Sequence, residues 1–285
     1  MDTPSAEQEL QARARTLLES GEADVVVGHG EGNQPPKTTP VFITDPADVG
    51  RLVLTPFCFN DLAAWLTRKD LRARFPRIAI VAKEPDIRAV IVLVQEHQVD
   101  PNAVRVIGVR IDAPGDPDSP CAVLPETTLE GLQKHLQDDF QARDMGPEQL
   151  RQVEELEAMA PAERWAFWRA QFDKCIRCYA CRQACPMCYC DRCIAEMNQP
   201  QWVETSAHPR ANMAWNITRA FHLAGRCINC GECERACPVD IPLMALNRFL
   251  ARQVESHFGY RAGYDVEAYQ PFATYSPEDT EDFIR

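Results

Sequence analysis

The chain has 285 residues, of which 45% are hydrophobic, and its formal net charge is −12 at pH 7. This length is sufficient for two globular domains with buried cores. The surplus of acidic residues argues against nucleic acid or an anionic membrane surface as a partner, because both attract Lys and Arg. The sequence has no run of about 18 apolar residues, and its first residues form neither a basic start nor an apolar core, so we expect no membrane insertion, no export and a cytoplasmic location.

The first half of the chain shows helix and strand patterns in alternation. Residues 5–20 carry an apolar stripe at helical spacing and predict a helix. Short β-like runs at residues 24–28 and 41–44 follow. They enclose a stretch rich in Gly, Pro, Asn and Thr, residues 28–40, which we expect to be a loop.

A strand–helix–strand unit is predicted between residues 77 and 110, with Pro85 at the start of the helix. Such a unit normally contributes two parallel strands to an α/β sheet. We therefore expect residues 1–145 to form one α/β domain, and we interpret this domain as the region that docks a partner or a cofactor.

After Pro147 the β patterns stop and helix formers dominate. Helices are predicted over residues 148–160, 162–173, 209–223 and 242–256. The expected fold is thus an α/β N-terminal domain followed by a mainly α-helical dicluster ferredoxin domain, residues 146–257. The last segment, residues 258–285, is rich in Tyr and Phe but has no periodicity, and we expect an extended arm packed on this protein or on a partner.

Two cysteine motifs dominate the second half. Thirteen cysteines are present, and eleven of them fall between Cys175 and Cys237. Both motifs read C-x2-C-x2-C-x3-C-P. The cysteines of the first motif are Cys175, Cys178, Cys181 and Cys185, and those of the second are Cys227, Cys230, Cys233 and Cys237.

This spacing predicts two 4Fe-4S clusters with crossed ligands. Two-residue gaps let three thiolates of one loop bind a single cluster, while the fourth cysteine binds the other. The first cluster is assigned to Cys175, Cys178, Cys181 and Cys237, and the second to Cys227, Cys230, Cys233 and Cys185. Structural zinc is the alternative, although longer gaps between cysteine pairs are more usual for zinc.

The two motifs lie far apart in the sequence. Between Cys185 and Cys227 there are 41 residues, including a predicted helix in which Met213, Ile217 and Phe221 recur at helical spacing. We therefore expect the clusters to lie between helices. This arrangement resembles the α-helical ferredoxin domain found in heterodisulfide reductases and in the iron-sulfur subunits of succinate dehydrogenase-type enzymes.

Three further cysteines follow the first motif directly: Cys188, Cys190 and Cys193. One interpretation is a third centre, either a cluster or a zinc ion, with Cys58 as the fourth ligand because a helix is expected to start beside it. Cys121 is the other candidate for that position. The alternative interpretation is a buried, reduced lining without metal.

Charged and titratable residues adjoin the motifs. Lys174, Arg177 and Arg226 lie beside predicted ligands, where cations would offset the charge of a cluster and raise its reduction potential. His208 and His222 flank the predicted helix between the motifs, and we interpret both as capped or packed side chains rather than as ligands.

The segments Cys175–Cys193 and His222–Pro238 resemble those of dicluster iron-sulfur subunits similar to the β subunits of formate dehydrogenases and deazaflavin-reducing hydrogenases. The resemblance extends to Leu54–Leu66, Ile78–Gln95 and Val106–Val109. Members of this set accompany flavin oxidoreductases and heterodisulfide reductase-like complexes. The resemblance therefore implies that the chain carries electrons between a catalytic subunit and a partner.

The sequence departs from this family at two positions. A cysteine often occupies the position of Pro85 in the family, and another commonly follows the strand near Ile111, but this sequence has neither. A cofactor or cluster built on those two cysteines is therefore not expected here.

Two functions from different classes are the main candidates, and a structural metal-dependent scaffold without redox chemistry, which would bind zinc rather than iron, is a third. The first is an electron-transfer subunit that relays electrons between a catalytic flavin or metal subunit and a partner, and no catalytic acid, base or nucleophile is assigned to it. The second is an oxidoreductase subunit that binds flavin or deazaflavin in its N-terminal domain. The sequence contains neither a G-x-G-x-x-G pattern after a strand nor a P-loop lysine, so no nucleotide fingerprint supports the second function.

Overall fold

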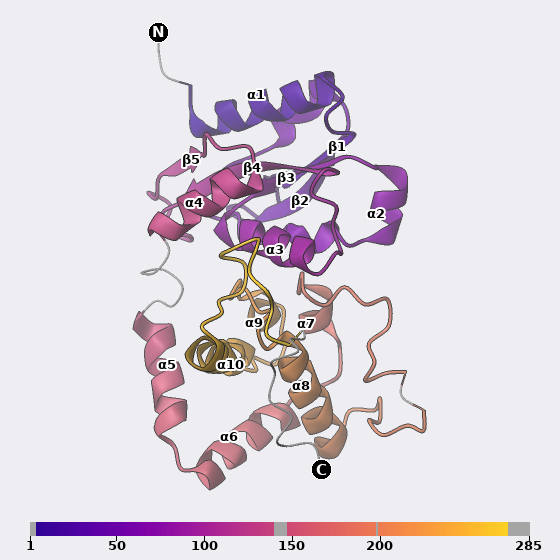
Figure 1. The fold of residues 1–285 in the computed structure, drawn as a ribbon, viewed down its shortest axis with the longest axis vertical. Coiled ribbons are helices and arrows are strands. Elements are labelled where there is room, and N and C mark those ends of the chain that lie inside the picture. Colours follow the sequence, from indigo (N-terminus) through magenta and orange to yellow (C-terminus); the bar gives the residue numbers. More distant parts are fainter. Residues whose placement is uncertain (1–3, 140–146, 198, 273–285) are drawn as a thin grey trace.

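The structure is a computed structural model, and it describes residues 4–139, 147–197 and 199–272. A region with strands, built from the first half of the chain, lies beside a helical region built from the second half (Figure 1). The predicted fold class, α/β followed by mainly α-helical, is confirmed.

The first half forms a mixed five-stranded sheet in the order β2-β1-β3-β4-β5. Its strands are β1 (Val25–Glu31), β2 (Thr38–Ile43), β3 (Ile78–Ala82), β4 (Val104–Ile111) and β5 (Cys121–Val123). The three central strands are parallel, and an antiparallel strand closes each edge. Since α3 (Glu84–Gln95) connects the parallel strands β3 and β4, the predicted strand–helix–strand unit is confirmed.

Helices and short 3-10 turns pack around this sheet. They are α1 (Ala6–Glu19), η1 (Pro46–Arg51), η2 (Ala63–Trp65), α2 (Lys69–Arg74) and α4 (Leu129–Asp139). Figure 1 places α1 on one side of the sheet and α3 on the other, next to the helical region. Every residue of α3 from Asp86 to Leu93 is buried, because this helix is covered on more than one face.

Strand β1 continues into residues that the sequence predicts to be a loop. A Cβ atom on Gly28 would lie 2.4 Å from Leu52 Cδ2 and 3.2 Å from Val81 Cγ2, so any larger residue there would displace these two packed side chains. The prediction of a loop over residues 28–40 is therefore wrong at both ends, since only residues 32–37 separate β1 from β2.

The second half is helical. Its helices are α5 (Pro147–Ala158), α6 (Pro161–Asp173), α7 (Ala180–Gln183), α8 (Pro209–Leu223), α9 (Glu232–Arg235) and α10 (Leu243–Phe258). Four of them match predicted helices, and α8 begins at a proline in the first turn, as expected. Within the described ranges no helix has both the length and the apolar content needed to cross a bilayer.

The segment after α10 packs on the α/β region. Gln95 at the end of α3 donates to the carbonyl oxygens of Asp265 at 2.7 Å and Ala268 at 2.9 Å. Arg88, also on α3, donates to the carbonyl oxygen of Ala262. The arm is thus docked on this protein as far as it is described, and residues 273–285 of the predicted arm lie outside the described residues.

Candidate iron-sulfur site

Both cysteine motifs fold into loops of the same backbone geometry. In the first loop Arg177 and Tyr179 have φ angles of 58° and 60°, and in the second Asn229 and Gly231 have φ angles of 59° and 78°. A left-handed residue in such a loop turns successive N–H groups towards one concave side, an arrangement that binds anions and occurs at iron-sulfur sites. Three of these four residues are not glycine, so the surrounding structure must stabilise this conformation.

Each loop leads into one turn of helix, and these turns match as well. α7 follows the first loop and α9 the second, and the two short helices contact each other. The N–H of Cys185 donates to Arg182 O at 3.3 Å, and the N–H of Cys237 donates to Glu234 O at 3.0 Å. The fourth cysteine of each motif is therefore held at the same point of a repeated structure, with the two repeats side by side.

The thiols fall into two groups by electrostatic proximity. The thiols that act on Cys181 are those of Cys175, Cys237 and Cys178. The thiols that act on Cys230 and Cys233 include those of Cys185 and Cys227, and Cys233 is also within range of Cys181, so the two groups adjoin. Each group thus contains one cysteine from the other motif. The assignment of these groups as ligand sets stays a prediction.

All thirteen cysteines are free thiols. Burial raises the pKa of the Cys227 thiol to about 11 and the pKa of the Cys233 thiol to about 12. A hydrogen bond from Cys188, with the guanidinium of Arg219 nearby, lowers the pKa of Cys185 to about 6. Because metal ligation requires thiolates, cluster insertion near neutral pH has to release protons from the buried thiols.

Two buried asparagines hold the cysteine loops in place. Asn212 on α8 donates through Nδ2 to the carbonyl oxygen of Cys175 at 2.7 Å, and Asn247 on α10 donates to the Sγ atom of Cys233 at 3.6 Å. Both side chains are at most 3% exposed. The sequence interpretation missed them. The feature of the sequence that could have identified Asn212 is a stripe of polar residues on α8, in which Asn212, Asn216 and Arg219 recur at helical spacing.

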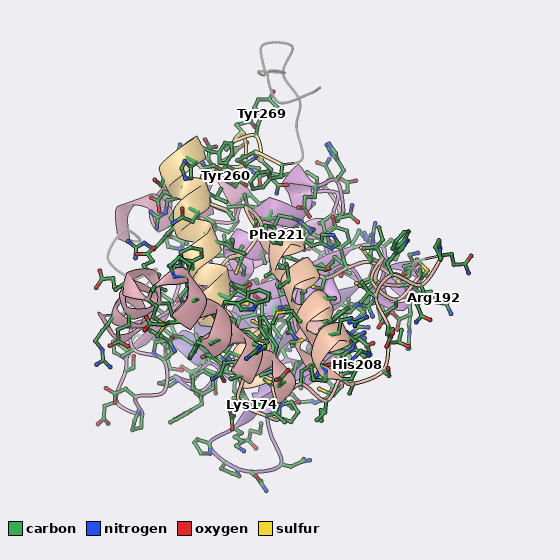
Figure 2. All side chains as sticks on the ribbon, turned by 90° about the horizontal axis from the view of Figure 1, so that it is seen from below. Lys174, Arg192, His208, Phe221, Tyr260 and Tyr269 are labelled. Carbon is green, nitrogen blue, oxygen red and sulfur yellow. The ribbon has the colours of Figure 1, made fainter. Side chains whose placement is uncertain are left out.

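The cysteines after the first motif lie in different surroundings. The Cys188 thiol is hydrogen-bonded to Cys185, which brings it next to the second thiol group. Cys190 is exposed, and the neighbouring Arg192 lies at the periphery of the molecule (Figure 2).

Cys58, the predicted fourth ligand of a third centre, is buried in the core of the α/β region with 2% of its surface exposed. Its Sγ atom accepts a hydrogen bond from the Thr55 N–H at 3.5 Å and approaches the carbonyl oxygen of Val53 at 3.9 Å. Its thiol also lies close enough to Cys121 to affect the pKa of that thiol. The described contacts of Cys58 are thus local to the α/β region, and the third centre stays a prediction.

The cations predicted to lie beside the ligands differ in their partners. Arg177 is buried and donates to two carbonyl oxygens, Ala211 O at 3.0 Å and Glu204 O at 3.1 Å. Lys174 is exposed at the rim of the molecule (Figure 2). Arg226 forms a bidentate ion pair with Glu96 of the α/β region.

The two histidines lie at opposite ends of α8, and His222 is exposed rather than packed. His208 is the N-cap residue of α8 and pairs with Glu204. His222 lies in the last turn of α8, where its carbonyl oxygen accepts from Arg226 Nη1 at 3.0 Å.

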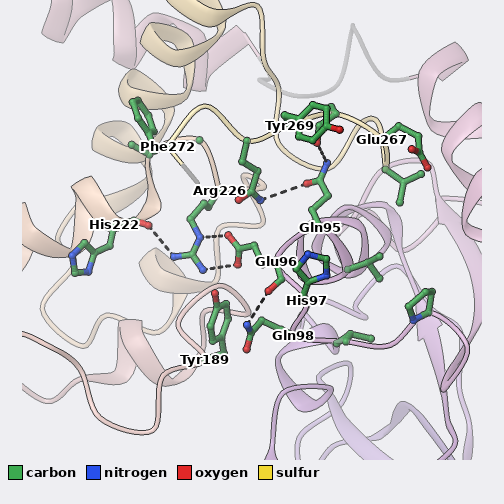
Figure 3. Close-up of a pocket in the computed structure, with 18 of the residues that line it drawn as sticks. Gln95, Glu96, His97, Gln98, Tyr189, His222, Arg226, Glu267, Tyr269 and Phe272 are labelled. Atoms are coloured by element: carbon green, nitrogen blue, oxygen red, sulfur yellow. Dashed lines mark hydrogen bonds and ion pairs between the residues drawn. The ribbon is translucent and has the colours of Figure 1, made fainter. Parts of the chain in front are cut away.

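A cavity of about 1220 Å³ lies between the end of α3, the end of α8 and the arm. Figure 3 shows the Arg226–Glu96 pair at its centre, with Tyr189 beside it and Phe272 at its border. The Arg226 guanidinium lies 5.1 Å from the centroid of the Tyr189 ring. Because Arg226 directly precedes Cys227, the cavity adjoins the second cysteine loop.

The residues present fit iron-sulfur clusters by their donor chemistry. Eight thiols on two repeated loops, concave N–H groups and nearby guanidinium groups are what an anionic thiolate-bound cluster requires. In the part of the chain that the structure describes, no group of three or more His, Cys, Asp or Glu side chains is placed to hold a single metal ion.

Comparison with known protein families shows that residues 171–241, which contain both cysteine motifs, match the 4Fe-4S dicluster domain. The F420-dependent formate dehydrogenase subunit beta of Methanocaldococcus jannaschii is 36% identical over 98 residues, which are 34% of this chain and 25% of that protein. The F420-dependent formate dehydrogenase 1 subunit beta of Methanococcus maripaludis is 37% identical over 101 residues, which are 35% of this chain and 25% of that protein. The matched segments thus span about a quarter of the length of these curated relatives.

Among solved structures, a chain of the F420-reducing [NiFe] hydrogenase complex from Methanosarcina barkeri matches 36% of this chain and 38% of its own length, with 17% identity and a TM-score of 0.30. That score supports no statement about the fold. The resemblance inferred from the cysteine motifs is confirmed by the family match and the formate dehydrogenase relatives: the chain contains a 4Fe-4S dicluster domain and is related to β subunits of F420-dependent formate dehydrogenases.

Proposed function

We propose that this chain is an electron-transfer subunit of a cytoplasmic oxidoreductase complex of the formate dehydrogenase, hydrogenase or heterodisulfide reductase type. It relays electrons between a catalytic subunit with a flavin or metal centre and a partner. The observation that supports this proposal is the pair of repeated cysteine loops, each grouped with the fourth cysteine of the other.

In this proposal the ligands are crossed. Cys175, Cys178, Cys181 and Cys237 hold the first 4Fe-4S cluster, and Cys227, Cys230, Cys233 and Cys185 hold the second. When bound, the clusters supply one-electron redox chemistry. Asn212 and Asn247 fix the two loops, Cys233 is buried, and six of the other motif cysteines are half-buried, whereas Cys178 is exposed.

The proposal divides the chain into three functional parts. Residues 1–145 dock a partner or cofactor, residues 146–257 hold the clusters, and residues 258–285 form the arm. The proposal also includes a third metal centre on Cys188, Cys190, Cys193 and Cys58. The iron and sulfide analysis described next tests it.

Anaerobic purification with any associated polypeptides, followed by iron and sulfide analysis, tests the cluster content. We expect about eight irons and eight sulfides per chain, and about twelve of each if a third cluster is present. Stoichiometric zinc without iron would contradict the proposal.

Serine variants test the crossing. With crossed ligands, Cys237→Ser and Cys175→Ser perturb the same electron paramagnetic resonance signal, and Cys185→Ser and Cys227→Ser perturb the other. If Cys237→Ser instead matched Cys227→Ser, the crossed assignment would be wrong. Cys121→Ser is the matched control, because this half-buried cysteine lies in β5 of the α/β region.

The cavity beside the second loop supports a second function, a flavin- or deazaflavin-binding oxidoreductase subunit. Its volume of about 1220 Å³ accommodates a large cofactor, and Tyr189, Phe272 and Arg226 offer aromatic and cationic contacts. A flavin or deazaflavin absorbance band at one equivalent per chain would favour this function, and a chain purified with full iron content but without such a band would rule it out.

A further inference from the structure

Helix α8 directs a buried arginine towards the cysteines. The Arg219 side chain is 5% exposed, and its Nη2 atom donates to the carbonyl oxygen of Cys181 at 3.0 Å. Its Nε atom is fully buried and has no hydrogen-bond partner. A buried guanidinium N–H without an acceptor is costly, so this group requires an acceptor that the protein does not supply.

The charge of Arg219 is also unbalanced. Among the described residues no carboxylate forms an ion pair with Arg219. Arg226, by contrast, is compensated by the bidentate pair with Glu96. An isolated buried cation is strongly unfavourable unless an anion lies nearby.

The groups that surround Arg219 are thiols of both motifs. The thiols whose charges act on its guanidinium are those of Cys185, Cys188, Cys233 and Cys181. Cys181 belongs to the first proposed ligand set, and Cys185 and Cys233 belong to the second. The guanidinium therefore lies within electrostatic range of both sets.

We propose that Arg219 is a positioning residue that stabilises the reduced form of both clusters, with its unpaired Nε–H as a donor to their sulfur ligands. The inference rests on the proposed electron-transfer function. A 4Fe-4S cluster held by four thiolates is an anion, and each added electron increases its negative charge. A fixed, buried cation favours the more negative state, so Arg219 raises the reduction potentials of both clusters.

Three variants of the full chain test this inference: Arg219→Met, which removes the charge; Arg219→Lys, which retains it; and Lys174→Met, the matched control. Lys174 also adjoins a predicted ligand, but it is exposed, so water and salt screen its charge. The readouts are iron and sulfide content and an anaerobic redox titration of each cluster followed by electron paramagnetic resonance.

We expect Arg219→Met to lower the ratio of reduced to oxidised cluster at a fixed potential at least about tenfold for both clusters, a shift of roughly 59 mV for a one-electron couple. Arg219→Lys and Lys174→Met are expected to leave both ratios within about threefold of the parent protein. If Arg219→Met loses its clusters while Arg219→Lys keeps them at parental potentials, the charge itself is required, which also supports the inference.

Unchanged potentials in Arg219→Met, a shift of one cluster alone, or loss of clusters from both Arg219 variants would overturn the inference. A parent protein without iron would instead overturn the proposed function, so the two failures are distinguishable.

Discussion

Asn212 connects helix α8 to the first cysteine loop. Its Nδ2 atom donates to Cys175 O, while its backbone carbonyl accepts from Asn216 Nδ2 at 2.8 Å. The side chain is 1% exposed, so neither bond is replaced by water when it is lost. Together with the Arg177–Ala211 and Arg219–Cys181 bonds, this amide holds the first cysteine loop against α8.

Asn212→Ala is expected to destabilise the cluster-loaded protein by about 1–3 kcal/mol, because Cys175 O loses its buried donor. The measurement is the apparent melting temperature under anaerobic conditions, together with the rate of cluster loss to a chelator, and we expect a lower temperature and faster loss. The control is Arg210→Ala, an exposed position on the same helix, for which a change within about 0.5 kcal/mol is expected. Equal behaviour of the two variants would show that the contact is unimportant.

The sequence predicted the bounds of α8, but its apolar positions mark only part of the buried face. Met213 and Ile217 are half-buried against the core of the helical region, whereas Phe221 is 67% exposed. The buried face includes Asn212, Asn216 and Arg219. Polar side chains are normally read as solvated, and only the position of the cysteine loops shows that these three face the interior.

At the scale of elements, the arm covers α3 by backbone contact. Gly263 has a φ angle of 79°, and a Cβ atom there would lie 2.6 Å from both Cβ and O of Arg88. The arm can therefore approach α3 this closely only with glycine at this position.

Gly263→Ala is expected to detach the arm, at a cost of about 2–4 kcal/mol from overpacking and the left-handed backbone. Limited proteolysis should then cut after α10, and the melting temperature should fall. Gly259→Ala is the matched control: its φ angle is 63°, but a Cβ atom there meets nothing within 4 Å, so only about 1 kcal/mol of backbone strain is expected. Identical proteolysis patterns would contradict the role of close approach.

At the scale of the whole molecule, the α/β region and the helical region are joined by buried polar contacts next to the second loop. Arg226 pairs with Glu96, and Glu232 accepts a hydrogen bond from the Asp61 N–H at 3.0 Å. Arg226 also donates to Met187 O at 3.3 Å, which follows the first motif. One arginine therefore connects α3 with segments adjoining both cysteine motifs.

Glu96→Ala is expected to destabilise the protein by about 2 kcal/mol, less than for a fully buried pair because water reaches part of Arg226. The measurement is anaerobic thermal unfolding. The control is Asp191→Ala, whose pair with Lys69 is 64% and 76% exposed, and about 0.5 kcal/mol or less is expected there. A loss of the same size in both variants would argue against a special role for the Glu96 contact.

The cysteine motifs can be predicted from the sequence because cluster ligation requires their spacing. The strand–helix–strand unit can be predicted because such a connection normally joins two parallel strands. The strand through Gly28 and the interior role of Arg219 could not be predicted in this way. Both depend on residues distant in sequence, Leu52 in one case and the cysteine loops in the other.

The docking of the arm on α3 has a consequence for synthesis of the chain. Arg88 and Ala262, joined by hydrogen bonds, are 174 positions apart. During synthesis α3 is made long before residues 262–268 that cover it. The covering of α3 is therefore among the last contacts of the fold that can form.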